Sequence, residues 1–313
     1  MIGNYLSKFP RVIILAIAIA LAAAGSHHAA GQTGFALKRE HGHYYLTTTF
    51  NGKADTEIFV GTGLPGILMD KDSYDTLLAD AGLEPVNLAR VNPEHPAFRF
   101  GQGDRDILKT LTGTVDIGGL RYDGMIFVID KFDKIAVPIH ILKNQADTTA
   151  NLIRFNFRRK TLDFIPRDSI DSAAMNRYKV TSYAPLLVIE TTLELSDAYG
   201  HNGRITGPFI FDLGNGTPMY LFSKHPDTMN FLKTGKFKKQ TAKATKSGKK
   251  AGKGIFAGFC KVGDRTIRGI SVGISEKIDL PAIGCVGPSL FLKGEVVIDP
   301  ENEVILYTKF PSY

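Results

Sequence analysis

The chain has 313 residues, of which 43% are hydrophobic and 22% charged, and its formal net charge is +7 at pH 7. This composition is that of an ordinary soluble globular protein, and it excludes a chain too polar to form a core. The positive net charge comes from one segment, because residues 233–253 contain nine lysines and no acidic residue. Without these nine charges, the rest of the chain has a net charge of 7 − 9 = −2. The basic segment is expected to be a solvated loop.

The N-terminus predicts an export signal. Lys8 and Arg11 precede an uninterrupted apolar run, Val12–Ala24, which ends in small residues. That order is typical of a cleaved secretory signal, and the run is shorter than the roughly twenty residues that a membrane span needs. The signal is expected to cover residues 1–25, or up to 31, which places the protein in the periplasm or outside the cell. An uncleaved membrane anchor is the alternative.

Beyond the signal, short segments with period-two alternation and frequent glycine predict an all-β fold with small helical insertions. In chain order, strands are expected over 44–50, 125–129 and 270–274, and short helices over 73–81 and 226–232. Long stretches with the 3.6-residue period of a helix are few, so the helices are secondary to the sheets.

Four features recur in the same order in the two halves. Asn51-Gly52 stands ten residues before Gly61, and Asn202-Gly203 stands ten residues before Asp212. Three glycines follow in each half with the same spacing, at 113, 118 and 124 and at 258, 263 and 269, and an alternating apolar strand comes after each triplet. Strand–turn–strand segments over 152–164 and 295–307 close the halves. This ordered set predicts an internal duplication, and the cleft between the two lobes is the natural place for a site.

The domain boundaries follow from the repeat. The N-terminal lobe is predicted over 32–167, a polar linker over 168–182, and the C-terminal lobe over 183–313, with a Lys-rich loop over 233–253. The loop is a candidate contact for anionic surfaces, whereas specific nucleic-acid binding is not expected because few aromatic residues interleave with the lysines. Two cysteines, Cys260 and Cys285, either pair in an oxidising compartment or are buried as free thiols.

A hydrophobic strand runs into a glycine turn in both halves, as Phe-Val-Gly-Thr-Gly over 59–63 and as Ile-Phe-Asp-Leu-Gly over 210–214. This layout resembles the aspartic peptidases, above all the bacterial retropepsin-like group with two fused lobes, over nearly the whole mature chain. The resemblance implies a bilobal pepsin-like double β-barrel in which each lobe supplies one catalytic Asp. Two close carboxylates cannot both ionise, so one acts as base while the other stays protonated, and together they activate a water.

In the C-terminal lobe, the resemblance makes Asp212 the candidate catalytic residue. Leu213 replaces the small hydroxyl residue of the family, and Gly214 and Asn215 complete the loop. The Ile-Gly pair that supports such a loop is Ile283-Gly284.

In the N-terminal lobe, Gly61 stands where the family has its other Asp, so this catalytic position is degenerate. Thr62 and Gly63 keep their places in the loop, but residues 137–140 contain no Ile-Gly pair. Gly101 and Gly103 are the candidates for the flap.

These departures favour a pseudoenzyme: an exported aspartic-peptidase-like protein, impaired in catalysis, that binds a peptide, a protein or another ligand in the cleft. A monomer without metal or cofactor is expected. The alternative is an active endopeptidase in which Asp212 works with Asp55, Asp70 or Asp104, or with Asp212 of a second chain. A third interpretation makes Asp212 a structural turn residue that is satisfied by its own backbone.

Overall fold

The computed structural model describes residues 33–87, 106–130, 132–145, 147–183, 186–241, 253–276 and 280–310. Strands dominate these residues, and the helices among them are α2 (Lys71–Leu77), α4 (Pro226–Thr234) and short 3-10 turns. The prediction of an all-β fold with small helical insertions is therefore confirmed. In the part of the chain that is described, no helix is long and apolar enough to cross a membrane. The predicted signal lies outside the described residues.

The N-terminal lobe is built from antiparallel hairpins and parallel strand pairs. Its strands are β1 (Thr33–Glu40), β2 (His43–Phe50), β3 (Lys53–Gly61), β4 (Ile67–Met69), β5 (Glu84–Pro85), β6 (Ile107–Ile117), β7 (Leu120–Ile129), β8 (Ile135–Pro138), β9 (Lys143–Asn144), β10 (Leu152–Asn156) and β11 (Thr161–Ile165). Strands β2–β3 and β6–β7 are antiparallel hairpins, and β3 lies parallel to β8. Strand β4 pairs in parallel with β7 and antiparallel with β8.

The C-terminal lobe repeats this topology. Its strands are β12 (Met175–Ser182), β13 (Val188–Asp197), β14 (Asn202–Phe211), β15 (Met219–Phe222), β16 (Lys239–Thr241), β17 (Lys253–Val262), β18 (Arg265–Ser275), β19 (Gly284–Val286), β20 (Glu295–Asp299) and β21 (Val304–Thr308). Strands β13–β14 and β17–β18 are hairpins, β14 lies parallel to β19, and β15 pairs in parallel with β18 and antiparallel with β19. The pairing order of the first lobe thus recurs, as an internal duplication predicts.

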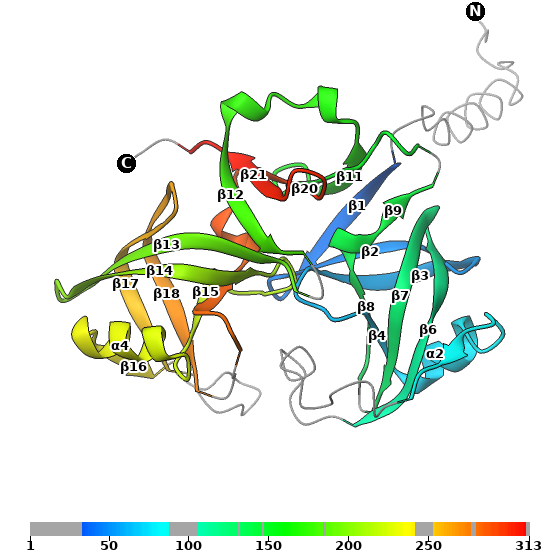
Figure 1. The fold of residues 1–313 in the computed structure, drawn as a ribbon, viewed down its shortest axis with the longest axis horizontal. Helices are drawn as coiled ribbons and strands as arrows, with labels where there is room; N and C mark the ends of the chain where they lie inside the picture. Colours follow the sequence, from blue (N-terminus) through cyan, green and yellow to red (C-terminus); the bar gives the residue numbers. More distant parts are fainter. Residues whose placement is uncertain are drawn as a thin grey trace, which may run out of the picture.

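An antiparallel sheet in the order β1–β11–β10–β20–β21–β12 joins the lobes (Figure 1). The two closing hairpins meet at its centre, where β10 pairs with β20 from Ile153↔Ile298 to Asn156↔Glu295. Both hairpin turns are held in the same way: the Asn156 side chain accepts the N–H of Arg159, and the Asp299 side chain accepts the N–H of Asn302. Asp299 is therefore a turn residue.

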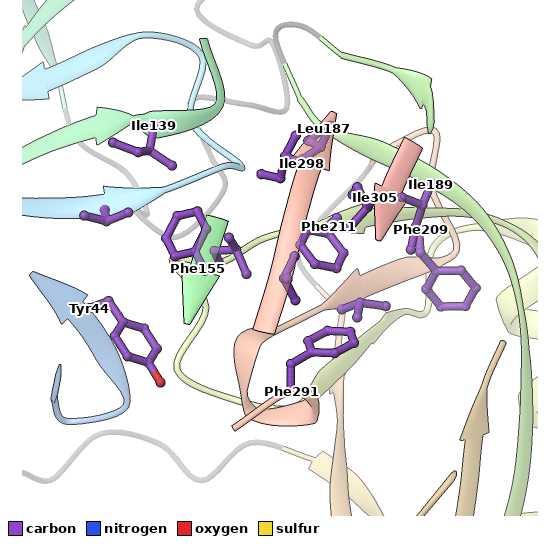
Figure 2. Close-up of a cluster of buried hydrophobic side chains, with 14 of the residues drawn as sticks. Tyr44, Ile139, Phe155, Leu187, Ile189, Phe209, Phe211, Phe291, Ile298 and Ile305 are labelled. Atoms are coloured by element: carbon purple, nitrogen blue, oxygen red, sulfur yellow. The ribbon is translucent and has the colours of Figure 1, made fainter. Parts of the chain in front are cut away.

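The largest apolar core runs continuously from one lobe to the other. Phe155 on β10 and Phe211 on β14 are both fully buried in it, and the Phe211 ring lies 5.6 Å from that of Phe291. Figure 2 shows Phe155 and Tyr44 on one side of Ile298 and the Phe211–Phe291 pair on the other. Burying each phenylalanine contributes about 1.5–3 kcal/mol, so the ends of the strands that lead to the site are rigidly anchored.

The predicted linker over 168–182 needs a correction. Residues 167–169 and 172–174 form 3-10 turns, and Met175–Ser182 is strand β12, which pairs with β21 and, from Lys179 on, with β13. Buried Tyr178 and Val180 alternate with exposed polar residues in this strand. Such a strand has the polar composition of a linker because only one of its faces is buried.

The second Asn-Gly pair does not form the turn that the first one does. Asn51 and Gly52 adopt φ of 47° and 80° in the tight β2–β3 turn, whereas Asn202 is the first residue of β14 and pairs with Ser196. The β13–β14 turn comes earlier in the chain. There the Asp197 carboxylate accepts the N–H groups of Tyr199 and His201, so a side chain holds this longer turn.

The Lys-rich loop is shorter than the predicted range 233–253. Its ends belong to α4, β16 and β17, and residues 242–252 lie outside the described part of the chain. Phe237 is buried with its ring 5.0 Å from that of Phe231, and the N–H of Lys238 donates to Asp197 at 2.9 Å. Apolar packing and a buried carboxylate therefore anchor the start of this segment.

Candidate functional site

Asp212 follows directly after β14, where the chain leaves the core of the C-terminal lobe. Its N–H donates to the carbonyl of Val286 at 2.9 Å, which extends the parallel pairing of β14 and β19 to the acid itself. Phe211, the preceding residue, is fully buried. The backbone of Asp212 is thus positioned by a strand pair and by the core.

Gly61 occupies the equivalent point of the N-terminal lobe, at the end of β3. Phe209, three residues before Asp212, pairs with Gly284, and Ile58, three residues before Gly61, pairs with Ile135. The two lobes therefore place position 61 and position 212 at matching ends of matching strands. The register also shows that Lys134-Ile135, rather than residues 137–140, is the counterpart of the supporting Ile-Gly pair.

The Thr62 hydroxyl crosses from one lobe to the other and holds the chain on both sides of Asp212. It donates to the carbonyl of Phe211 at 2.5 Å and accepts the N–H of Leu213 at 2.9 Å. Thr62 is fully buried, so both bonds are protected from water. Leu213 has no hydroxyl with which to form the reciprocal bonds, and its side chain is buried in the main core instead. The cross-lobe connection is therefore one-sided.

Asp212 is 6% exposed as a whole residue, and its carboxylate is hydrogen-bonded by backbone N–H groups alone. Gly214 donates to Oδ1 at 2.8 Å, and N–H groups of the opposite loop, those of Gly63 and Thr62, also bond to the carboxylate. Burial raises the pKa of Asp212 from an ordinary 3.8 to about 6, and these N–H groups, which favour the ionised form, offset only part of that rise.

Leu64 closes the N-terminal side of the site. A β-carbon built on Gly61 would lie 3.0 Å from a δ-carbon of Leu64, so this leucine occupies the space into which a side chain at position 61 would extend. Leu64 belongs to a small apolar cluster with Leu68, Phe127 and Ala136. The side of the site that lacks the acid is thus filled with hydrocarbon.

The corresponding place in the C-terminal lobe is polar. Asn215, three residues after Asp212 as Leu64 is three after Gly61, donates from Nδ2 to the sulfur of Cys285 at 3.4 Å. Its Oδ1 accepts the N–H and the hydroxyl of Thr217. Cys285 and Cys260 are both buried free thiols, so they do not form the disulfide that their even number permits. Burial first, and then the charge of Asp212, raise the pKa of the Cys285 thiol.

His43 makes a second contact between the lobes, which the sequence did not suggest. Its Nδ1 lies 2.7 Å from the carbonyl oxygen of Gly214, and since a carbonyl only accepts, this nitrogen carries the proton. The ring also packs 5.5 Å from that of Phe59. The hairpin tip before His43 brings Gly42 so close to Gly216 that a β-carbon there would lie 2.8 Å from its carbonyl oxygen. The β1–β2 hairpin therefore supports the loop that carries Asp212.

Asp55 and Asp70, two candidate partners of Asp212, have other positions in the fold. Asp55 is exposed with φ of 55°, and Asp70 caps α2 by accepting the N–H of Ser73 at 2.8 Å. Asp104 and the flap candidates Gly101 and Gly103 lie outside the described residues. Within the described ranges, no group of three or more His, Cys, Asp or Glu side chains could hold a metal ion.

The fold is similar to that of a solved peptidase. The crystal structure of the aspartic proteinase from Irpex lacteus aligns with a TM-score of 0.52 at 12% sequence identity, over 89% of this chain and 97% of that chain. No protein-family model and no curated protein matches the sequence. At this identity the likeness shows the fold alone, which is the all-β, bilobal, pepsin-like fold that the sequence predicted.

Proposed function

We propose that this protein is an exported, aspartic-peptidase-like protein that binds a peptide or another ligand between its lobes without hydrolysing it. One observation carries the proposal: of two equivalent strand ends, only one bears a carboxylate, and Leu64 fills the space beside the other, Gly61. Activation of a water by a carboxylate pair needs both groups, one ionised and one protonated. A lone acid cannot supply both roles at once, but it can still form hydrogen bonds with a ligand.

Retention of the site's framework supports ligand binding. The Thr62 bonds to Phe211 and Leu213, and the His43 bond to Gly214, hold the Asp212 loop against the N-terminal lobe. Buried polar contacts of this kind are costly to leave unsatisfied, so they keep the carboxylate in one geometry. Export is proposed on the N-terminal signal pattern, and a single chain suffices for the site because both loops belong to it.

A cleavage assay tests the proposal. The mature protein and an Asp212→Asn variant are incubated with a mixed peptide library from pH 3 to pH 7, and new termini are identified by mass spectrometry. We expect no cleavage that depends on Asp212, together with retention of library peptides by the intact protein. Cleavage that disappears in Asp212→Asn would overturn the proposal and favour the active endopeptidase. Cleavage that is equal in both proteins comes from a contaminant or from another site.

A further inference from the structure

We propose that the group bound at Asp212 is an aliphatic ammonium, such as the side chain of a lysine in a bound peptide. This inference rests on the proposed function, because it names the chemistry that the same site would recognise. It is argued from the hydrogen bonds, the charges and the packing around the carboxylate.

The hydrogen bonds of Asp212 come from the two loops beneath it. Gly214 donates at 2.8 Å, and the backbone of Gly63 lies so close that a β-carbon there would be 2.9 Å from the carboxyl carbon and 3.2 Å from each oxygen. All the donors are backbone N–H groups, which stabilise the ionised form without neutralising it. A carboxylate has about four acceptor positions, so it retains capacity for a donor from a ligand.

The protein supplies this carboxylate with no countercharge in the part of the chain that is described. The ion pairs there join other acids to lysine, arginine or histidine, and none includes Asp212. The titratable groups packed around its loop are the thiol of Cys285 on β19 and His43 on β2, and His43 donates to the Gly214 carbonyl rather than to the acid. A buried charge without a partner is expensive, so a ligand cation would gain more here than a neutral donor.

Apolar side chains flank the two loops that hold the carboxylate. Leu64 fills the place next to Gly61, and the Phe59 ring lies 2.9 Å from the position of a β-carbon built on Gly214. Both side chains belong to the apolar cluster of the N-terminal lobe or pack against it. A lysine side chain that reaches Asp212 would place its methylene groups against these apolar residues and its ammonium at the carboxylate.

The test uses two peptide libraries that are identical except for one fixed position, which is lysine in one and norleucine in the other, with neutral residues at all other positions. Norleucine keeps most of the aliphatic chain and lacks the amine. We expect the intact protein to bind the lysine library at least about tenfold more tightly at pH 7.5, as a charge-assisted hydrogen bond provides. Asp212→Asn should abolish this preference, whereas Asp227→Asn, the same change at an exposed acid, should leave it unchanged.

Binding of the lysine library should also strengthen about tenfold between pH 5 and pH 7, because a carboxyl with a pKa of about 6 is mostly protonated at the first pH and mostly ionised at the second. Equal affinity for the two libraries would overturn the inference and leave the proposed function standing. A lysine preference that survives in Asp212→Asn would overturn it as well, by assigning the preference to another surface. If neither library binds, the inference fails, and so does the part of the proposed function that makes the ligand a peptide. Circular dichroism of each variant shows that it is folded.

Discussion

Asp212 should make the protein less stable as the pH rises from 4 to 6. Its pKa is about 6 in the folded chain against an ordinary 3.8, so between these values the folded state holds a proton that the unfolded state has lost. The stabilisation from this proton is complete below about pH 4 and is lost as the pH rises through 6. A difference of about two pKa units at 1.36 kcal/mol each amounts to about 3 kcal/mol.

Asp212→Asn isolates this contribution from those of the other acids. The free energy of unfolding of each protein is measured by urea denaturation at intervals from pH 3.5 to pH 8. Circular dichroism is the signal, because the chain contains no tryptophan. The amide adds an offset that does not depend on pH, since its NH₂ group cannot accept the bonds that the carboxylate accepts. The difference, variant minus wild type, should rise by about 3 kcal/mol between pH 4 and pH 7 and then stay constant. A difference that is flat across this range would refute the reasoning about Asp212.

Three further substitutions test the contacts around the acid. Thr62→Val removes a hydroxyl with two buried partners and should lower the free energy of unfolding by about 2–4 kcal/mol. Thr62→Ser keeps the hydroxyl and should lower it by only about 1 kcal/mol, for the lost methyl group. Equal losses would mean that the hydroxyl bonds contribute nothing. Gly61→Asp should lower the free energy of unfolding by about 1–3 kcal/mol, because the new side chain overpacks against Leu64. Adding Leu64→Ser should relieve that cost, which a double-mutant cycle measures. Additive effects of the two substitutions would show that the two positions do not touch. His43→Phe keeps the ring but loses the bond to Gly214, so urea denaturation should show a loss of about 0.5–1.5 kcal/mol; unchanged stability would contradict this contact.

Much of the fold could be predicted from local patterns. In the two long hairpins β6–β7 and β17–β18, a glycine marks the place where the backbone needs a positive φ, at Gly118 with 63° and Gly263 with 55°. In β18 the pattern holds, because Val272 and Ile274 are buried and Ile270 is partly buried, whereas β7 buries both of its faces from Ile126 to Ile129. The linker prediction was wrong over residues 175–182 because a strand with one exposed face and a loop have similar polar composition. The second Asn-Gly pair was misjudged because that turn lies earlier in the chain, where Gly200 has φ of 85° and the Asp197 side chain accepts two backbone N–H groups.

By itself, the sequence determined that one half of a duplicated β protein carries an acid before its glycine turn and that the other half carries Gly61. Strand period, turn glycines and the order of the repeat are properties of the sequence itself, and they can be recognised without knowledge of the tertiary contacts. Only the tertiary structure decided what surrounds Asp212. The Thr62 bonds span 149 and 151 residues and the His43 bond spans 171. No local pattern encodes contacts at such separations, because they form only when the central sheet and the shared core bring the two lobes together. Leu64 likewise occupies the space beside Gly61 through side-chain packing, which depends on how the strands pair in the tertiary structure.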